Sequence, residues 1–214
     1  MKDQKQHWNN AHSVGQIDHY PHTAEVTDFA KEVLTIIKPN SRILELGCGA
    51  SNDPAGFAQA GHTVIATDFS EVVISKNKEQ FKDQTGIEFE VLDLNEPIAF
   101  EDNKFDVVYA RLSLHYFPDI VTHKIFTEIQ RVLRPNGYLC FLCKSTEDPK
   151  YGQGTEVAKD IFESKSGHLR HFFSEDYTRD LLSGKFEIEK LEMGRENFYG
   201  DDSAFIKVIA KAIK

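Results

Sequence analysis

The stretch SRILELGCGASN, residues 41–52, decides the fold. It begins as an apolar run of strand length and ends in a turn with glycine at positions 47 and 49. Pro54 stands where a helix can begin and Gly61 where it can end, and a second apolar run, HTVIAT, follows at 62–67. The pattern therefore predicts a strand, a short helix over 54–60 and a second strand.

Helices and strands continue to alternate outside this unit. Apolar spacing predicts a helix over 23–38 with Thr23 as its cap, a helix from Ser70 to about residue 82, one over 121–134 and one capped by Ser174. Further strands are expected at 86–92, 105–110, 138–143, 185–192 and 203–211. The last two are joined by a loop and can pair antiparallel. We expect a doubly wound α/β domain whose seven-stranded sheet is mostly parallel, with the last strand antiparallel.

The composition limits the classes of protein to which the chain can belong. The 214 residues include 25 Lys+Arg and 34 Asp+Glu, and the net charge of −9 opposes binding to nucleic acids and anionic membranes. No apolar run reaches the length of a membrane span, and the first residues lack the apolar core of a secretion signal, so we expect a soluble, cytoplasmic protein. With no repeat or linker, residues 1–214 are expected to form one domain. Cys140 and Cys143 lie in one predicted strand, where positions three apart face opposite sides, and are expected in the core.

Ligands of open α/β sheets bind beyond the carboxyl ends of the strands. There, the glycines at 47 and 49 allow a sharp turn and a close approach of ligand to backbone. Asp68 ends the second strand and can accept hydrogen bonds from both hydroxyls of a ribose. Phe69 can lie against an adenine ring, and Asp93 at the end of the third strand suits an adenine amino group. These residues predict an adenosine-binding cleft.

The motifs ILELGCGAS, IATDFS, VLDLN, FDVVYARLSLHYF and EIQRVLRPNGYLCFL resemble those of the class I S-adenosylmethionine-dependent methyltransferases, over about residues 40–144. The resemblance implies S-adenosylmethionine as cofactor, S-adenosylhomocysteine as product and an antiparallel final strand. It places Glu45 and the two glycines near the methionine portion, and Arg111 near it by its backbone. Ser51 departs from the third glycine of many members. The expected cofactor-binding residues are Glu45, Gly47, Cys48, Gly49, Asn52, Asp68, Phe69, Asp93, Leu94 and Arg111.

Two alternatives remain open. A protein that binds the cofactor without transferring a methyl group, as a sensor or partner subunit, would carry the same motifs. A nicotinamide-dependent oxidoreductase would need glycine at position 52, where Asn52 stands. No metal site is predicted, because the histidines at 7, 12, 19 and 22 lack a cysteine or carboxylate partner at a ligand spacing.

The methyl acceptor is expected to be a small molecule, methylated on oxygen, nitrogen, sulfur or another chalcogen, as in the tellurite-resistance-like and thiopurine-like branch that the chain resembles. His115, just past the fourth strand, is the candidate base, although it could equally pack a loop. Residues 1–22 are expected to act as a lid and 145–173 as a substrate-side insertion. The expected substrate-binding residues are His12, His19, Tyr20, Tyr116, Arg170 and His171.

Overall fold

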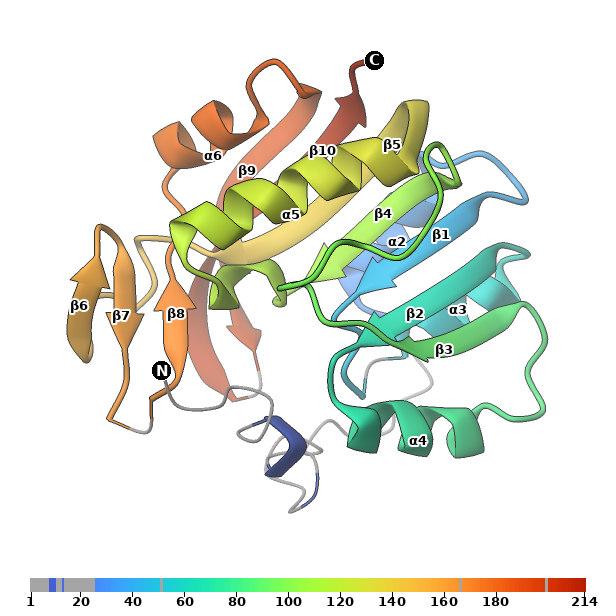
Figure 1. The fold of residues 1–214 in the computed structure, drawn as a ribbon, viewed down its shortest axis with the longest axis horizontal. Coiled ribbons are helices and arrows are strands. Elements are labelled where there is room, and N and C mark those ends of the chain that lie inside the picture. The colour runs from blue at the N-terminus through green and yellow to red at the C-terminus, as the bar shows by residue number, and fades with distance from the viewer. Residues whose placement is uncertain (1–7, 11–12, 14–25, 51, 166, 199) are drawn as a thin grey trace.

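The computed structural model describes residues 8–10, 13, 26–50, 52–165, 167–198 and 200–214. The predicted sheet is confirmed, with seven strands in the order β3-β2-β1-β4-β5-β10-β9 (Figure 1). Only β10 runs antiparallel to its neighbours, pairing with β5 on one side and β9 on the other. The strands are β1 Arg42–Leu46, β2 Thr63–Asp68, β3 Ile87–Val91, β4 Phe105–Arg111, β5 Leu133–Lys144, β9 Phe186–Phe198 and β10 Asp201–Ala212.

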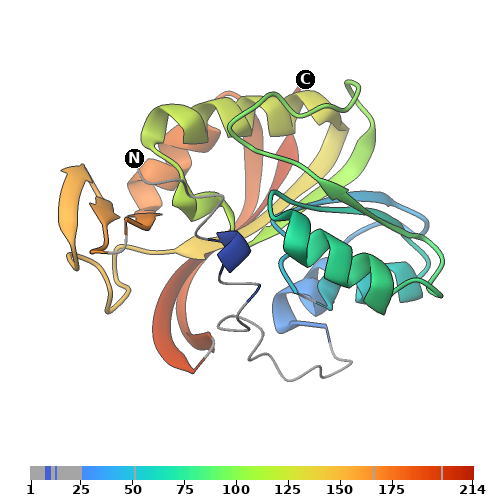
Figure 2. The ribbon, with the colours of Figure 1, turned by 60° about the horizontal axis from the view of Figure 1, so that its bottom comes forward.

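Helices cover both faces of the sheet and create two apolar cores (Figures 1 and 2). One core joins the sheet to α5 (Asp119–Val132) and α6 (Glu175–Leu182), and the other joins it to α2 (Asp28–Leu34), α3 (Asp53–Gln59) and α4 (Glu71–Gln80). Because strand residues alternate between faces, Cys143 belongs to the first core and Cys140 to the second. Both thiols are buried, as expected.

Helix starts follow the capping residues, with one correction. Ser70 and Ser174 cap α4 and α6 as predicted, accepting hydrogen bonds from Val73 N and Tyr177 N. The cap of α2 is Thr27, whose hydroxyl accepts from Ala30 N at 3.3 Å, whereas Thr23 lies outside the described residues. The helix also ends at Leu34, earlier than predicted. A second hydroxyl residue four positions along thus serves as the cap.

The junction of α5 and β5 also differs from the prediction. The helix predicted over 121–134 and the strand predicted at 138–143 leave residues 135–137 between them, but α5 ends at Val132 and β5 begins at once at Leu133. Leu133 pairs with Phe105 and Tyr138 with Val107, so residues 134–137 form a bulge in the ladder. Proline is tolerated there because a bulged residue need not donate to the partner strand.

Residues 145–173 contain a small antiparallel sheet that the sequence did not reveal. Its strands are β6 Thr155–Ala158, β7 Ile161–Glu163 and β8 Leu169–His171, in that order. All four residues of β6 are exposed, so neither face of the strand needs apolar side chains. The sequence of β6 therefore lacks the apolar alternation that predicts a strand. The rings of Tyr151, Phe162 and Phe172 pack against one another with centroids 5.1–5.9 Å apart. β8 packs against η1 (Leu114–Tyr116), the short helix that follows β4.

Within the described residues, the structure holds no helix with the length and apolar character needed to cross a membrane.

Candidate functional site

The glycine turn after β1 is closed on one side and open on the other. Gly47 has φ +72°, and a Cβ added there would lie 2.3 Å from the Cβ of Ser113. Ser113 itself donates a hydrogen bond to Leu46 O at 2.6 Å, which holds the segment after β4 against the turn. Gly49 has φ +50°, and no atom of the described residues lies within 4 Å of a Cβ added there. A ligand can therefore approach the backbone of the turn at Gly49 and not at Gly47.

Asp68, at the end of β2, fixes the shape of this turn. Its Oδ2 accepts a hydrogen bond from Gly49 N at 3.0 Å, and its Oδ1 accepts one from Ser70 N at 2.9 Å. Asn77 of α4 donates to Gly49 O at 2.7 Å from the other side. A carboxylate can accept several hydrogen bonds, including those of ligand hydroxyls. The sequence did not reveal this structural role, and ribose binding by Asp68 stays a prediction.

Glu45 is a buried acid beside the turn. Its side chain is 2% exposed, and its Oε2 has no hydrogen-bond partner among the residues described. Burial raises the pKa of this carboxyl well above its usual value, the charges of Asp53 and Asp68 raise it further, and Arg111 opposes them. A buried acid with an unused oxygen and two acidic neighbours favours a ligand that brings positive charge.

Asp53, which the sequence analysis missed, ties the first two helices together behind the turn. Its carboxylate accepts hydrogen bonds from Thr27 N at 2.7 Å and Thr27 Oγ1 at 2.8 Å. The Tyr109 hydroxyl of β4 donates to it at 2.8 Å. The signal for Asp53 in the sequence is its position next to Pro54, where a helix can begin. Its partners Thr27 and Tyr109 lie in distant segments, so the spacing of residues along the chain does not identify them.

The remaining predicted cofactor residues lie around the same edge of the sheet. Phe69 and Asn52 are partly exposed, at the ends of β2 and the start of α3. Asp93 accepts hydrogen bonds from the backbone and side chain of Asn95 at 2.9 and 2.8 Å, and it too is partly exposed. Leu94 packs against a core, and the Arg111 guanidinium lies 5.0 Å from the Phe198 ring. Cys48 is buried, and burial is the chief cause of its raised thiol pKa.

His115 lies in η1, past the end of β4, and is 0% exposed. Neither ring nitrogen has a hydrogen-bond partner within the described part of the chain. Burial holds its pKa well below the usual value, with further lowering by the charges of Arg170 and Lys144. The imidazole is therefore neutral near pH 7 and has a nitrogen lone pair to accept a proton.

Aromatic rings surround the neighbouring Tyr116. Its ring centroid lies 4.3 Å from that of His115, 4.9 Å from that of His168 in a stacked arrangement, and 5.0 Å from that of Trp8. Trp8 also meets His168 edge-on at 5.2 Å. The predicted substrate residue Tyr116 thus belongs to a wall of rings, which we call the ring wall (Trp8, His115, Tyr116 and His168).

The other predicted substrate residues fall in three groups. Arg170 is partly exposed on β8, 5.9 Å from the Phe172 ring. His171 is 2% exposed and packs between Phe173 and Tyr177 at centroid distances of 4.9 and 4.7 Å. Its ring thus contacts core side chains. His12, His19 and Tyr20 lie outside the described residues.

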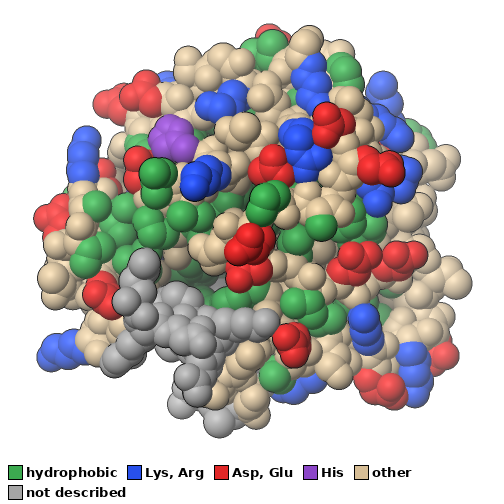
Figure 3. Space-filling view, in the orientation of Figure 1, with side chains coloured by type: hydrophobic (Ala, Val, Ile, Leu, Met, Phe, Trp, Pro, Cys, Tyr) green, Lys and Arg blue, Asp and Glu red, His purple; other side chains and the backbone are tan. Residues whose placement is uncertain are grey.

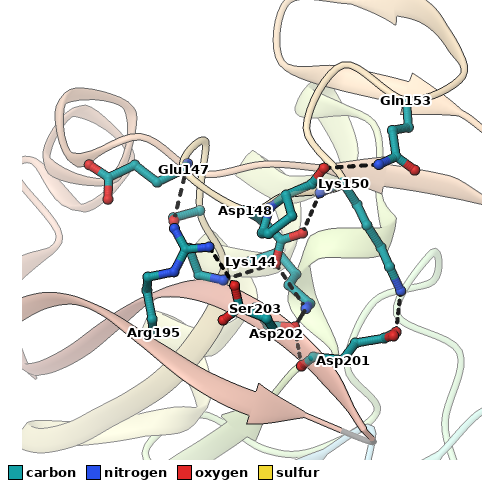
Figure 4. Close-up of polar contacts among 12 residues, drawn as sticks. Lys144, Glu147, Asp148, Lys150, Gln153, Arg195, Asp201, Asp202 and Ser203 are labelled. Atoms are coloured by element: carbon teal, nitrogen blue, oxygen red, sulfur yellow. Dashed lines mark hydrogen bonds and ion pairs between the residues drawn. The ribbon is translucent and has the colours of Figure 1, made fainter.

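A buried ion pair at the end of β5 was also missed. Lys144 Nζ lies 3.0 Å from Asp148 Oδ2, and this oxygen also accepts a hydrogen bond from Ala204 N at 3.0 Å (Figure 4). Lys144 contacts Ser203 Oγ as well, and Lys150 pairs with Asp201 nearby (Figure 4). These contacts anchor the start of the 145–173 segment to β10, so the small sheet is held at the same edge as the glycine turn.

Apolar side chains gather on the left of the space-filling view, over the three-stranded sheet and the start of α5 (Figure 3). Ile120 and Val157 are 68% and 51% exposed in this part of the surface.

Comparisons with known proteins find similar sequences and similar folds. Residues 44–141 match the sequence model described as a methyltransferase domain. The chain is 31% identical over 166 residues to a demethylmenaquinone methyltransferase of Staphylococcus saprophyticus. That alignment covers 76% of this chain and 65% of the relative, so the chain spans less than two thirds of the relative's length.

Solved structures share the fold. The 1,6-didemethyltoxoflavin-N1-methyltransferase of Burkholderia thailandensis, crystallised with 1,6-didemethyltoxoflavin and S-adenosylhomocysteine, superposes with a TM-score of 0.79 at 16% identity, over 99% of this chain and 88% of that one. The cyclase SpnF superposes with a TM-score of 0.73 at 14% identity, over 98% and 96% of the two chains. At such identities the likeness concerns the fold, which can host more than one reaction. Residues 44–141 thus match a methyltransferase domain, and the chain as a whole shares the fold of these solved structures.

Proposed function

We propose that this chain transfers a methyl group from S-adenosylmethionine to a small-molecule acceptor. The observation that carries the proposal is the buried Glu45 carboxyl, whose Oε2 has no partner among the described residues, next to the open side of the glycine turn at Gly49. A ligand there must bring hydrogen-bond donors and, to offset Glu45, Asp53 and Asp68, positive charge. An ammonium and a sulfonium on one nucleoside meet this requirement, whereas a dinucleotide brings two negative phosphates.

The residues along the edge of the sheet suit the parts of this cofactor. Glu45 would bind the methionine end, with the Arg111 backbone, Cys48 and Asn52 lining that part of the site. Asp68 would bind the ribose, and Phe69 with Asp93 and Leu94 would enclose the adenine. When bound, the cofactor supplies a methyl group on a positively charged sulfur, which is already activated for transfer.

The chain's own contribution is to align the acceptor and to remove a proton where the acceptor has one. His115 is neutral because its pKa is lowered by burial, so one ring nitrogen can take the proton of an O–H, N–H or S–H group. The acceptor atom then forms its bond to carbon as the carbon–sulfur bond breaks, and the sulfur keeps the electron pair. Positioning alone contributes up to roughly 7–11 kcal/mol in ideal cases.

The acceptor side would be built from elements outside the matched domain. We propose that Tyr116, Arg170 and the segment 145–173 line it, and that residues 1–22, including His12, His19 and Tyr20, close over it as part of the same domain. His171 would support β8 from the core. The net charge of −9 favours a small molecule over a nucleic acid.

The test is product formation. The purified protein is incubated with methyl-labelled S-adenosylmethionine and a panel of phenols, amines, thiols and chalcogen oxyanions, and S-adenosylhomocysteine is measured by mass spectrometry. The proposal predicts label in one acceptor and an equal amount of S-adenosylhomocysteine, both lost in Asp68→Asn. Tight cofactor binding without transfer to any acceptor would instead support a sensor or partner subunit.

A further inference from the structure

Arg170 has a buried donor that the proposed cofactor does not use. Its Nε is buried and has no hydrogen-bond partner among the described residues. An unsatisfied buried donor is costly, and more so on a charged group. The guanidinium also lies 5.9 Å from the centroid of the Phe172 ring, which supplies no nitrogen or oxygen acceptor. A ligand oxygen at this point would satisfy the donor.

Two acidic side chains near the start of the 145–173 segment are already engaged by lysines. Asp148 is paired with Lys144, and Asp201 with Lys150 (Figure 4). Arg170, by contrast, forms no ion pair with any described residue, in a chain with 34 acidic side chains. Its positive charge is therefore available for an anion from outside the chain.

Arg170 lies beside the candidate base. β8, which carries Arg170, packs against η1, which carries His115. The His115 ring is fully buried, and both of its nitrogens lack partners among the described residues. Two elements in contact thus carry hydrogen-bonding nitrogens without partners among the described residues, and one of these side chains is cationic.

The surroundings of this pair select for a flat molecule. Tyr116 stacks on His168 at 4.9 Å and lies 4.3 Å from the His115 ring. Trp8 meets Tyr116 at 5.0 Å and completes the ring wall. Aromatic side chains bind planar groups by stacking or edge contact, with gains of about 0.5–1.5 kcal/mol for a ring pair.

We propose that the methyl acceptor is a planar ring compound with an anionic oxygen substituent, which Arg170 binds while the ring lies against the ring wall. The proposal rests on the proposed function, because the compound is the acceptor of the same site. The anionic oxygen is a ring carboxylate or an ionised ring hydroxyl, which share the same recognition by a guanidinium. His115 would then face a second, protonated group of the ring.

The experiment measures acceptor binding in the presence of saturating S-adenosylhomocysteine. The probes are 2-hydroxybenzoate, 2-hydroxybenzamide and phenol, titrated by ligand-observed NMR into wild-type protein and the variants Arg170→Gln, Arg170→Lys and Arg195→Gln. Arg195 is an exposed residue of β9 and pairs with Asp202 of β10. Its replacement is the matched control for the loss of one arginine.

We expect 2-hydroxybenzoate to bind wild type at least tenfold more tightly than the neutral amide. Arg170→Gln should remove that preference, Arg170→Lys should keep part of it, and Arg195→Gln should keep all of it. Equal binding of acid and amide, absence of binding by the acid, or an unchanged preference in Arg170→Gln would overturn the proposal. The wild-type comparison decides the matter even if Arg170→Gln fails to fold. If wild-type protein does not bind S-adenosylhomocysteine, the proposed function is refuted instead.

Discussion

Acidic pH should destabilise the packing of the small sheet against the core, because it protonates His171. Burial lowers the pKa of His171 from 6.5 to about 4, and the charges of Asp119 and Asp160 only partly oppose this effect. The ring packs against Phe173 and Tyr177, so it joins β8 to the core beneath α6. Protonation is therefore resisted in the folded protein and free in the unfolded chain.

The size of the effect follows from the two pKa values. The unfolded chain binds the proton more tightly, so stability falls as the pH falls from about 6.5 and continues to fall until about pH 4. His171 has a pKa of about 4 in the folded protein and 6.5 in the unfolded chain. From pH 7 to pH 5, this difference lowers the free energy of unfolding by about 2 kcal/mol.

Urea unfolding at pH 7 and pH 5 measures this loss in wild type and in His171→Gln. Carboxylates and the other histidines titrate in both proteins, so the difference between the two losses isolates His171. We expect wild type to lose about 2 kcal/mol more than the variant. A difference below about 0.5 kcal/mol would refute the reasoning, since it would mean that the ring is hydrated in the folded protein.

Three further changes test the site. Asp68→Asn places an amide against the Gly49 or Ser70 N–H and should weaken S-adenosylhomocysteine binding by about 1–3 kcal/mol in calorimetry; unchanged affinity would contradict the role of Asp68. Gly47→Ala forces a Cβ toward Ser113 at φ +72° and should cost about 2 kcal/mol of stability. This loss should exceed that of Gly49→Ala, whose Cβ would meet no atom of the described residues, and equal losses in urea unfolding would count against the close contact. Asp148→Ala leaves Lys144 buried without its carboxylate and should cost about 3–5 kcal/mol by urea unfolding with cofactor affinity unchanged; a loss below about 1 kcal/mol would show that the pair is dispensable.

The order and type of the main elements were predictable because their signals are local. Apolar runs of strand length alternate with helical spacing, and Ser70 and Ser174 mark helix starts by side chains that cap within three residues. The sequence analysis named Thr23 as the cap of α2, whereas Thr27 caps it in the structure, where its contact with Asp53 anchors that side chain.

The parts that could not be predicted depend on contacts between distant segments. Asp53 accepts hydrogen bonds from Thr27 and Tyr109, which lie 26 and 56 positions away in the sequence. No local pattern predicts these partners. The strands β6 to β8 are three or four residues long and are stabilised by rings from outside their ladders, so they lack a periodic pattern. Which nitrogens and oxygens stay unpaired, as in Glu45 and Arg170, is likewise a property of the folded chain alone.

The central claim is that the edge of the sheet binds S-adenosylmethionine through its acidic side chains. Calorimetric titration of the purified protein with S-adenosylmethionine, S-adenosylhomocysteine and NAD in parallel tests it most directly. The account predicts micromolar binding of both adenosyl ligands, loss of that binding in Glu45→Gln, and no heat from NAD. Binding of NAD alone, or silence from both adenosyl ligands in a folded protein, would contradict it.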